Sequence, residues 1–145
     1  MIPLSFPAPD FRVQNTENGP EIWDRFRKKW VMLQPEEWVR QNFLNWLSEI
    51  HHIPESLISV EKGLRDKSKK RYDILVFNRS HQPWMMVECK STEVLLNDAV
   101  LMQILSYHRS LQVKYIAITN GHQCHIAEMK EANQQWLASF PTFER

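Results

Sequence analysis

Glycine is scarce in this sequence, with three residues among 145. A phosphate-cradling loop such as G-x-x-x-x-G-K-[ST] needs glycines where the backbone approaches the phosphates, and the chain contains no such run. We therefore expect this chain not to bind ATP, so that any motor acting with it would be another protein.

Cysteine is scarce as well, and positive and negative charges nearly balance. Cys89 and Cys124 show none of the C-x-x-C spacing of a zinc site or a disulfide framework, and we expect both to be buried thiols. His122 and His125 around Cys124 also lack a recognised zinc spacing. Because the formal net charge is only +1, overall charge does not indicate a nucleic-acid-binding protein.

Long apolar runs are missing too. No stretch of about 18 apolar residues indicates a membrane span, and no charged-then-apolar leader with a small-residue cleavage site indicates a secretory signal. These absences predict a cytoplasmic protein with no membrane partner. The length and the hydrophobic content of 43% fit one domain with an adequate core. We expect a β extension over residues 1–33, a core over 34–128 and a tail over 129–145 that packs on the core.

The clearest positive signal is a pair of apolar strands that carry ionised residues. Residues 71–77 and 84–90 are rich in aliphatic and aromatic side chains, and the turn-like segment 78–83 between them predicts an antiparallel hairpin. A symmetric register of this hairpin places Asn78 opposite Pro83. That register decides which residues meet along the two strands.

Like charges meet in this register. The same sum of positions places Asp73 opposite Glu88, with Cβ atoms roughly 4.5–5.5 Å apart, where two carboxylates destabilise each other unless positive charge lies between them. A divalent metal would supply that charge. Because side chains alternate along a strand, Lys90 shares the face of Glu88 and Cys89 points the other way. Buried charges also satisfy one another without metal, so an ion-pair cluster of Asp73, Glu88 and Lys90 stays open as a structural alternative.

The N-terminal segment is predicted to form a small β extension. Residues 11–14 and 21–23 flank Asn18 and Gly19, a dipeptide typical of hairpin turns. Residues 30–33 continue as a further strand. We therefore expect a β-hairpin extension ahead of the core.

Two helices and several strands are predicted in the core. Apolar residues at helical spacing, with Pro35 at the first helical position and Asn97 or Asp98 as an N-cap, predict helices over residues 34–50 and 97–111. Further strands are expected over residues 57–61, 115–119 and 124–127, the second of them long enough in apolar residues to be central and parallel to a neighbour. The sequence thus predicts an α/β fold in which helices flank a mixed sheet.

Phase on the first helix separates its two glutamates. At about 100° per residue, Glu36 lies on the side of Val39 and Phe43, whereas Glu37 points away. Glu36 is therefore the better candidate for a site facing the sheet, although a glutamate in the first turn also stabilises the helix dipole. Arg40, one turn later, is a candidate partner of Glu36.

The second helix is expected to face the sheet with Val100, Ile104, Tyr107 and Leu111. Gln103 falls beside that stripe and four residues before Tyr107, so both side chains would lie on one face toward the sheet. An unpaired buried amide costs about 1–3 kcal/mol, so we expect Gln103 to have a partner. Without its motif, Tyr107 alone would be interpreted as a core aromatic residue.

Basic residues cluster at two places. One cluster precedes the hairpin and the other lies in the extension, and their members are Arg65, Lys67, Lys69, Lys70 and Arg71, and Arg25, Arg27, Lys28 and Lys29. Phosphate contacts supply most non-specific DNA affinity, so Lys69, Lys70 and Arg71 are candidates to hold a DNA backbone beside a metal site. A solvated turn and a charged edge strand are the alternatives.

Asp73 followed by Glu88-Cys89-Lys90 resembles the active-site signature of the PD-(D/E)XK nucleases, with Tyr72 where that family often has proline. The resemblance is closest to the N-terminal nuclease domain of the motor subunit of type I restriction enzymes. Three further segments resemble that family in the same order, namely its opening helix, its Q-x-x-x-Y motif and its strand-end turn, at residues 35–41, 103–107 and 118–121. The motor itself is missing from the chain.

The resemblance implies a restriction endonuclease-like core that acts as a Mg²⁺- or Mn²⁺-dependent DNA endonuclease. It implies catalytic roles for Asp73, Glu88, Lys90, Glu36, Gln103 and Tyr107. Asp73 and Glu88 are hard oxygen donors suited to Mg²⁺, with the backbone carbonyl of Cys89 as a third ligand. Lys90 would orient or deprotonate a metal-bound water or stabilise the transition state.

The partners follow from the same resemblance. DNA is the implied substrate, while a separate motor or restriction-modification subunit and a homodimer stay open. The alternative function is a non-catalytic DNA-binding or assembly module with the same fold.

Overall fold

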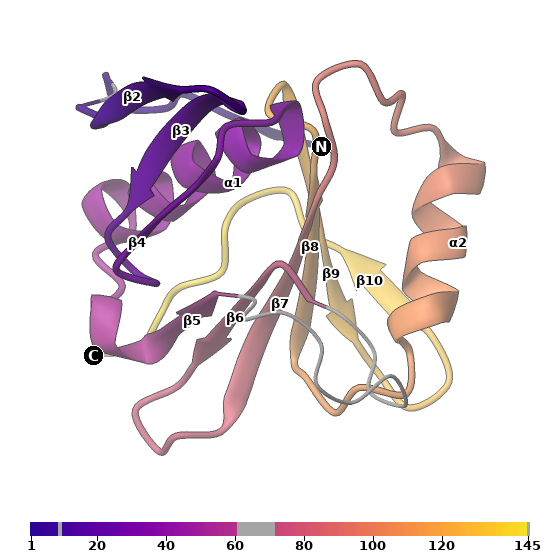
Figure 1. The fold of residues 1–145 in the computed structure, drawn as a ribbon. Helices are drawn as coiled ribbons and strands as arrows, with labels where there is room; N and C mark the ends of the chain where they lie inside the picture. Colours follow the sequence, from indigo (N-terminus) through magenta and orange to yellow (C-terminus); the bar gives the residue numbers. More distant parts are fainter. Residues whose placement is uncertain (9, 61–71, 145) are drawn as a thin grey trace.

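A central seven-stranded mixed sheet organises the molecule (Figure 1). The computed structural model describes residues 1–8, 10–60 and 72–144. The strand order is β1-β9-β8-β7-β6-β5, and β10 pairs with β9. The strands span β1 (Ile2–Pro3), β5 (Ile58–Val60), β6 (Ile74–Phe77), β7 (Pro83–Cys89), β8 (Tyr115–Thr119), β9 (Gln123–Met129) and β10 (Gln134–Trp136). Strands β7 and β8 run parallel and the other pairs are antiparallel, which confirms the predicted mixed sheet and the parallel pairing of residues 115–119.

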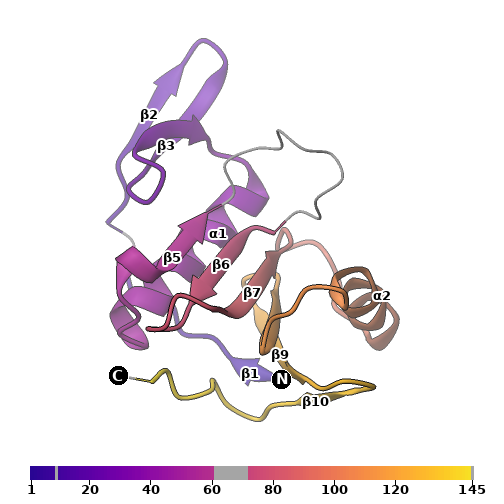
Figure 2. The ribbon, with the colours of Figure 1, turned by 90° about the horizontal axis from the view of Figure 1, so that it is seen from below.

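Two α-helices cover opposite faces of this sheet (Figures 1 and 2). Helix α1 (Pro35–Asn45) begins with proline and continues into the π-helical turn η1 (Trp46–Ile50), and a 3-10 turn η2 (Glu55–Leu57) leads into β5. Helix α2 (Asp98–His108) is capped by Asn97, whose side chain accepts the backbone N–H of Val100 at 2.9 Å. These starts confirm the predicted helix N-termini. None of the helices in the described ranges is both long and apolar enough to cross a membrane.

Alternation along β7 divides the core in two. Met85, Val87 and Cys89 pack into one core with the α1 side chains, whereas Met86 packs into a second core with the α2 side chains. All four are almost completely buried, because a central strand covered on both faces excludes water from both. Cys89 and Cys124 are buried free thiols in the first core, as predicted.

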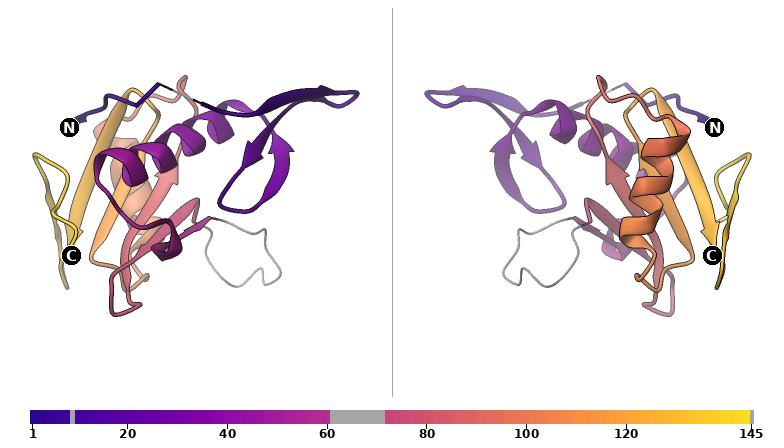
Figure 3. Two further views of the ribbon diagram at one scale, coloured as in Figure 1. Left: turned by 90° about the vertical axis from the view of Figure 1, so that its left-hand side faces the viewer. Right: turned by 90° about the vertical axis from the view of Figure 1, so that its right-hand side faces the viewer.

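A second, three-stranded antiparallel sheet stands to one side of α1 (Figure 3). It consists of β2 (Val13–Thr16), β3 (Gly19–Asp24) and β4 (Lys29–Met32). The β2–β3 hairpin confirms the predicted extension, with Thr16 paired to Gly19 across the turn. The segment before it does not belong to this sheet, because Ile2 and Pro3 pair with β9 in the central sheet.

The β6–β7 hairpin has the predicted register from the Ile74–Val87 pair to the Val76–Met85 pair, but not next to the turn. Ile74 pairs with Val87, so that residues 73 and 88 face each other by extension, but a bulge pairs Phe77 with Pro83. The expected pairing of Asn78 with Pro83 is therefore wrong. Asn78 instead closes the turn, because its side-chain oxygen accepts the N–H groups of Ser80 and Gln82, each at 2.9 Å.

The buried face of α2 agrees with the predicted stripe at Ile104, which is buried, and at Val100 and Leu111, which pack against the second core, but not at Tyr107. Its buried residues are Leu101, Ile104, Leu105 and His108. Gln103 and Tyr107 are exposed, Tyr107 to 51%. The expectation that this pair faces the sheet is wrong, because the stripe through residues 101, 105 and 108 has the same helical period and is the one that packs.

The C-terminal segment lies over the first core. After β10, Leu137, Phe140 and Phe143 pack against that core. Phe140 stacks on His51 with ring centroids 3.9 Å apart, and Phe143 meets Trp84 edge to face at 5.0 Å. Aromatic contacts of this kind hold the segment to the body of the molecule.

Candidate active site

Asp73 directly precedes β6 and is held by groups from two other elements. Its Oδ2 atom accepts the backbone N–H of Cys89 at 2.7 Å, and its Oδ1 atom accepts Nη2 of Arg40 at 3.2 Å. The Asp73 N–H donates to the carbonyl of Val87. The side chain is 16% exposed. Asp73 is thus fixed between β7 and α1, with its carboxylate close to the pocket surface.

Glu88 lies on β7 and is held from the other face of the sheet. Its Oε1 atom is 2.8 Å from Nε2 of His108 on α2, and its Oε2 atom is 3.5 Å from Nζ of Lys90. The contact with Lys90 confirms that both side chains share one face, while Cys89 between them packs in the core. The side chain of Lys90 is 35% exposed and therefore reachable from solvent.

These residues meet at a polar pocket of about 460 Å³ between β4, the first turn of α1 and the β6–β7 hairpin. It is lined by Val31, Met32, Gln34, Glu36, Glu37, Arg40, Tyr72, Asp73, Glu88, Cys89 and Lys90. The structure therefore brings together Asp73, Glu88, Lys90 and Glu36 from the sequence prediction, together with Cys89. Gln103 and Tyr107 are not among the described residues that line it.

Of the two glutamates in the first helical turn, Glu37 is placed differently from the prediction. Both line the pocket, but Glu36 is exposed, whereas Glu37, expected to point away, is only 8% exposed. The reason is the small β sheet, which covers that side of α1. Arg27 follows β3 and reaches Glu37 from this sheet, with Nη2 2.6 Å from Oε1.

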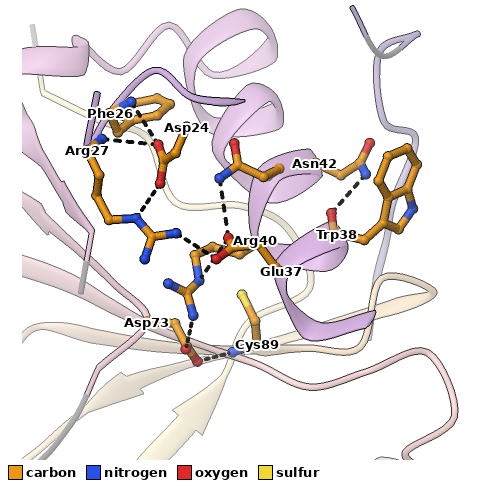
Figure 4. A network of polar contacts seen from close by, with 10 residues as sticks. Asp24, Phe26, Arg27, Glu37, Trp38, Arg40, Asn42, Asp73 and Cys89 are labelled. Atoms are coloured by element: carbon orange, nitrogen blue, oxygen red, sulfur yellow. Dashed lines mark hydrogen bonds and ion pairs between the residues drawn. The ribbon is translucent and has the colours of Figure 1, made fainter. Parts of the chain in front are cut away.

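Buried charges alternate in sign from the small sheet to the pocket (Figure 4). Asp24 pairs with Arg27, Arg27 with Glu37, Glu37 with Arg40 at 3.6 Å, and Arg40 with Asp73. Asp24 is fully buried and also accepts the N–H groups of Phe26 and Arg27. We call these five residues, Asp24, Arg27, Glu37, Arg40 and Asp73, the charge chain.

The pKa values of Asp73 and Glu88 are shifted in opposite directions. Burial raises the pKa of Asp73 to about 6, and the charges of Glu88 and Glu36 add to that rise, while the Cys89 N–H and Arg40 oppose it. Burial also acts to raise the pKa of Glu88, but the hydrogen bond from His108 and the charge of Lys90 outweigh it and lower the pKa. Negative charge at Asp73 is therefore not fully compensated by the protein's own groups.

The carboxylates at this pocket suit the ligand preferences of Mg²⁺. This ion keeps several waters and takes one or two carboxylates, so two carboxylates and an exposed glutamate at one polar pocket fit it. They do not form an all-protein cage, since no group of three or more His, Cys, Asp or Glu side chains in residues 1–8, 10–60 and 72–144 is arranged to hold a metal. Cys89 lines the same pocket.

Lys69, Lys70 and Arg71, expected to contact DNA, lie outside the described residues. His108 was missed by sequence reasoning, although its place four residues after Ile104 and seven after Leu101 put a polar group on the apolar stripe of α2. Nothing in the helix periodicity indicated Glu37, because its burial comes from a separate sheet.

Comparison with known families supports the restriction endonuclease-like fold. A family model described as the type I restriction enzyme R protein N terminus matches residues 35–141. The match includes the pocket residues contributed by α1 and the β6–β7 hairpin and begins after the small sheet. No curated protein matches the chain.

Proposed function

Because the chain belongs to the type I restriction enzyme R protein N-terminal family, we propose that it is a metal-dependent endonuclease that hydrolyses DNA phosphodiester bonds. The family is that of a nuclease-related domain of restriction-modification enzymes. The observation that carries the finer proposal is the meeting of Asp73, Glu88 and Lys90 at one polar pocket. Their types and order fit metal-assisted hydrolysis of a phosphate ester.

The proposed metal is Mg²⁺, or Mn²⁺ in its place. Asp73, Glu88 and the backbone carbonyl of Cys89 would hold it, and Glu36 would approach it through water. When bound, such an ion lowers the pKa of a coordinated water and neutralises charge on the scissile phosphate. The raised pKa of Asp73 supports this assignment, because a buried carboxylate near other carboxylates favours a cation beside it.

Lys90 is proposed to act on the attacking water or on the phosphate. Its ammonium group stays near Glu88 at 3.5 Å and is partly exposed to the pocket. From this position it would donate hydrogen bonds to a water or a phosphate oxygen and place positive charge where negative charge develops. Lys69, Lys70 and Arg71 are proposed to hold the DNA backbone.

A second candidate is favoured by one specific observation. Asp73 and Glu88 each already have a cationic neighbour from the protein, Arg40 for Asp73 and Lys90 for Glu88. This pairing is expected if the domain is a non-catalytic DNA-binding or assembly module whose carboxylates stabilise the fold. The same pairing is also compatible with a site that exchanges a protein cation for a metal.

Cleavage of supercoiled plasmid and of single-stranded DNA in Mg²⁺, Mn²⁺ or EDTA tests the proposal. The wild-type protein is compared with Glu88→Ala/Lys90→Ala. Glu128→Ala/Lys130→Ala is a matched control, because it removes the same residue types at the same spacing from the exposed end of β9, where Lys130 and Glu128 lie 3.2 Å apart. We expect metal-dependent cleavage that the control retains and the pocket variant loses.

Two other outcomes decide between the candidates. If the wild type does not cleave but binds Mn²⁺ in calorimetry, and the pocket variant does not bind it, the site is intact and needs a partner such as a motor subunit. Equal cleavage by the wild type and the pocket variant rules out the proposed site. Absence of both cleavage and metal binding favours the non-catalytic module.

A further inference from the structure

The small β2–β4 sheet takes part in the candidate site although it lies outside the family match, which begins at residue 35. Val31, Met32 and Gln34 line the pocket, and the last two strands of this sheet are joined by the segment that carries Arg27. The charge chain then connects Arg27 to Asp73. The small sheet is therefore connected to the Asp73 carboxylate through a series of ion pairs.

The residues of the charge chain are largely buried, and several ion pairs and hydrogen bonds hold them in place. Arg27 lies between Asp24 and Glu37, and its side chain is 11% exposed. The two carboxylate oxygens of Glu37 have different partners. Oε1 pairs with Arg27, whereas Oε2 pairs with Arg40 and accepts a hydrogen bond from Nε2 of Gln41 at 3.2 Å. The side chains of Glu37 and Arg40 are each 10% exposed. At this burial, solvent screens their charges much less than at the surface.

Arg40 stands between two carboxylates that compete for it. Its Nε atom is 3.6 Å from Glu37 and its Nη2 atom is 3.2 Å from Asp73 (Figure 4). A metal held by Asp73 would compete with Arg40 for the same carboxylate. A stronger attraction between Glu37 and Arg40 would therefore weaken the Arg40–Asp73 pair and make Asp73 available to a cation. A weaker attraction between Glu37 and Arg40 would keep Arg40 paired with Asp73.

We propose that Arg27 is a positioning residue that acts through Glu37 and Arg40 to set how readily Asp73 binds a divalent cation. The inference rests on the proposed metal site. By neutralising part of the Glu37 charge, Arg27 keeps Arg40 on Asp73 when no metal is bound. The N-terminal sheet is thus part of the site and tunes its affinity for metal.

Substitutions of Arg27 and of Glu37 should change the affinity for metal in opposite directions. In Arg27→Gln, Glu37 attracts Arg40 more strongly, so Mn²⁺ should bind tighter by roughly fivefold, within the coupling measured inside one ion-pair network. In Glu37→Gln, Arg40 loses that attraction and shifts to Asp73, so Mn²⁺ should bind more weakly by a similar factor. The double variant should follow Glu37→Gln, because Arg27 acts through Glu37.

Isothermal titration of the full chain with Mn²⁺, without DNA, measures these affinities, and thermal melting monitors the fold. Arg25→Gln is the matched control, because Arg25 lies in the same segment but pairs with Glu55 at 3.0 Å on the surface. It should leave the Mn²⁺ affinity unchanged. Arg27→Lys keeps the charge and should move the affinity less than Arg27→Gln, which keeps the test valid if the glutamine variant unfolds.

The outcomes separate this inference from the proposed function. A purely structural role would lower the melting temperature in both single variants and change their Mn²⁺ affinity in the same direction or not at all, which overturns the inference while the site stands. Failure of the wild type to bind Mn²⁺ overturns the proposed metal site and, with it, the role of Arg27.

Discussion

At the scale of single residues, the two pocket carboxylates are prepared differently by their surroundings. Glu88 keeps its charge easily, because His108 and Lys90 favour the ionised form. Asp73 is buried beside other carboxylates, and its pKa is raised to about 6 despite the N–H of Cys89 and the guanidinium of Arg40. Asp73 is therefore the residue whose ionisation opposes folding when no cation is bound.

This difference predicts a pH dependence that Asp73→Asn should remove. A carboxylate with a raised pKa in the folded state contributes stability that is fully present below its unfolded pKa, near 3.8, and is lost as pH rises through about 6. In EDTA, the unfolding free energy of the wild type relative to Asp73→Asn should fall by about 2 kcal/mol between pH 4 and pH 7. Urea unfolding across that range measures it, and a rise instead of a fall contradicts the assigned burial of Asp73.

His108 is the other residue with a distinct physical role. It is fully buried, bonds Glu88 through Nε2, and its Nδ1 atom has no hydrogen-bond partner within the described residues. His108→Ala should destabilise the protein by about 2–4 kcal/mol, since it leaves a cavity and removes the partner of a half-buried carboxylate. Exposed His122 gives the control, and His122→Ala should change the unfolding free energy by less than about 0.5 kcal/mol in the same urea measurement.

At the scale of elements, local signals in the sequence carried most of the prediction. Proline at the start of α1, Asn97 before α2 and the asparagine-glycine pair of the first hairpin each act through neighbouring backbone, so they could be identified without the fold. The facing of residues 73 and 88 followed from strand pairing near the middle of the hairpin. The pairing at the turn could not be predicted, because the bulge depends on how the Asn78 side chain closes the loop.

Errors arose where a second element decided the outcome. The predicted face of α2, with Tyr107 in its stripe and Gln103 beside it, and the observed face, with Leu101 and His108, share Ile104 and the same periodicity, so only packing against the sheet decides between them. Likewise, Glu37 is buried by a sheet that covers the outer side of α1. Sequence periodicity describes one helix at a time and does not contain this information.

The turn after β8 shows how one element fixes another. Gly121 has φ +89, and a Cβ atom built on it would lie 3.2 Å from Cγ2 of Val39 on α1. We expect Gly121→Ala to destabilise the protein by about 2–3 kcal/mol, because backbone strain adds to a contact in the first core. Gly19→Ala is the comparison, since Gly19 also has positive φ but its Cβ would meet only the end of Met32 at 3.6 Å. A smaller loss for Gly121→Ala than for Gly19→Ala in chemical denaturation would show that α1 yields to the turn.

At the scale of the whole molecule, the site lies where three layers meet. The β6–β7 hairpin supplies the carboxylates, α1 supplies Glu36 and Arg40, and the small sheet closes the pocket with β4. The near-zero net charge of the chain conceals this local concentration of ionised groups. These ionised side chains either bind a cation or only form ion pairs with one another.

Metal binding should distinguish these alternatives through the stability of the whole fold. An ion that binds only the folded state raises the unfolding free energy, by about 2.7 kcal/mol at a hundredfold excess over its Kd. We expect Mg²⁺ or Mn²⁺ to raise the Tm of the wild type and of Glu128→Ala/Lys130→Ala, but not that of Asp73→Asn/Glu88→Gln, which lacks both anionic ligands. In an ion-pair cluster, metal would leave every Tm unchanged and Glu88→Ala alone would lower the Tm, because Lys90 and His108 would lose their shared carboxylate. Since a cation site predicts a metal-induced rise in Tm and a structural cluster predicts none, a single melting series with and without metal distinguishes the two even if the chain requires a partner to cleave DNA.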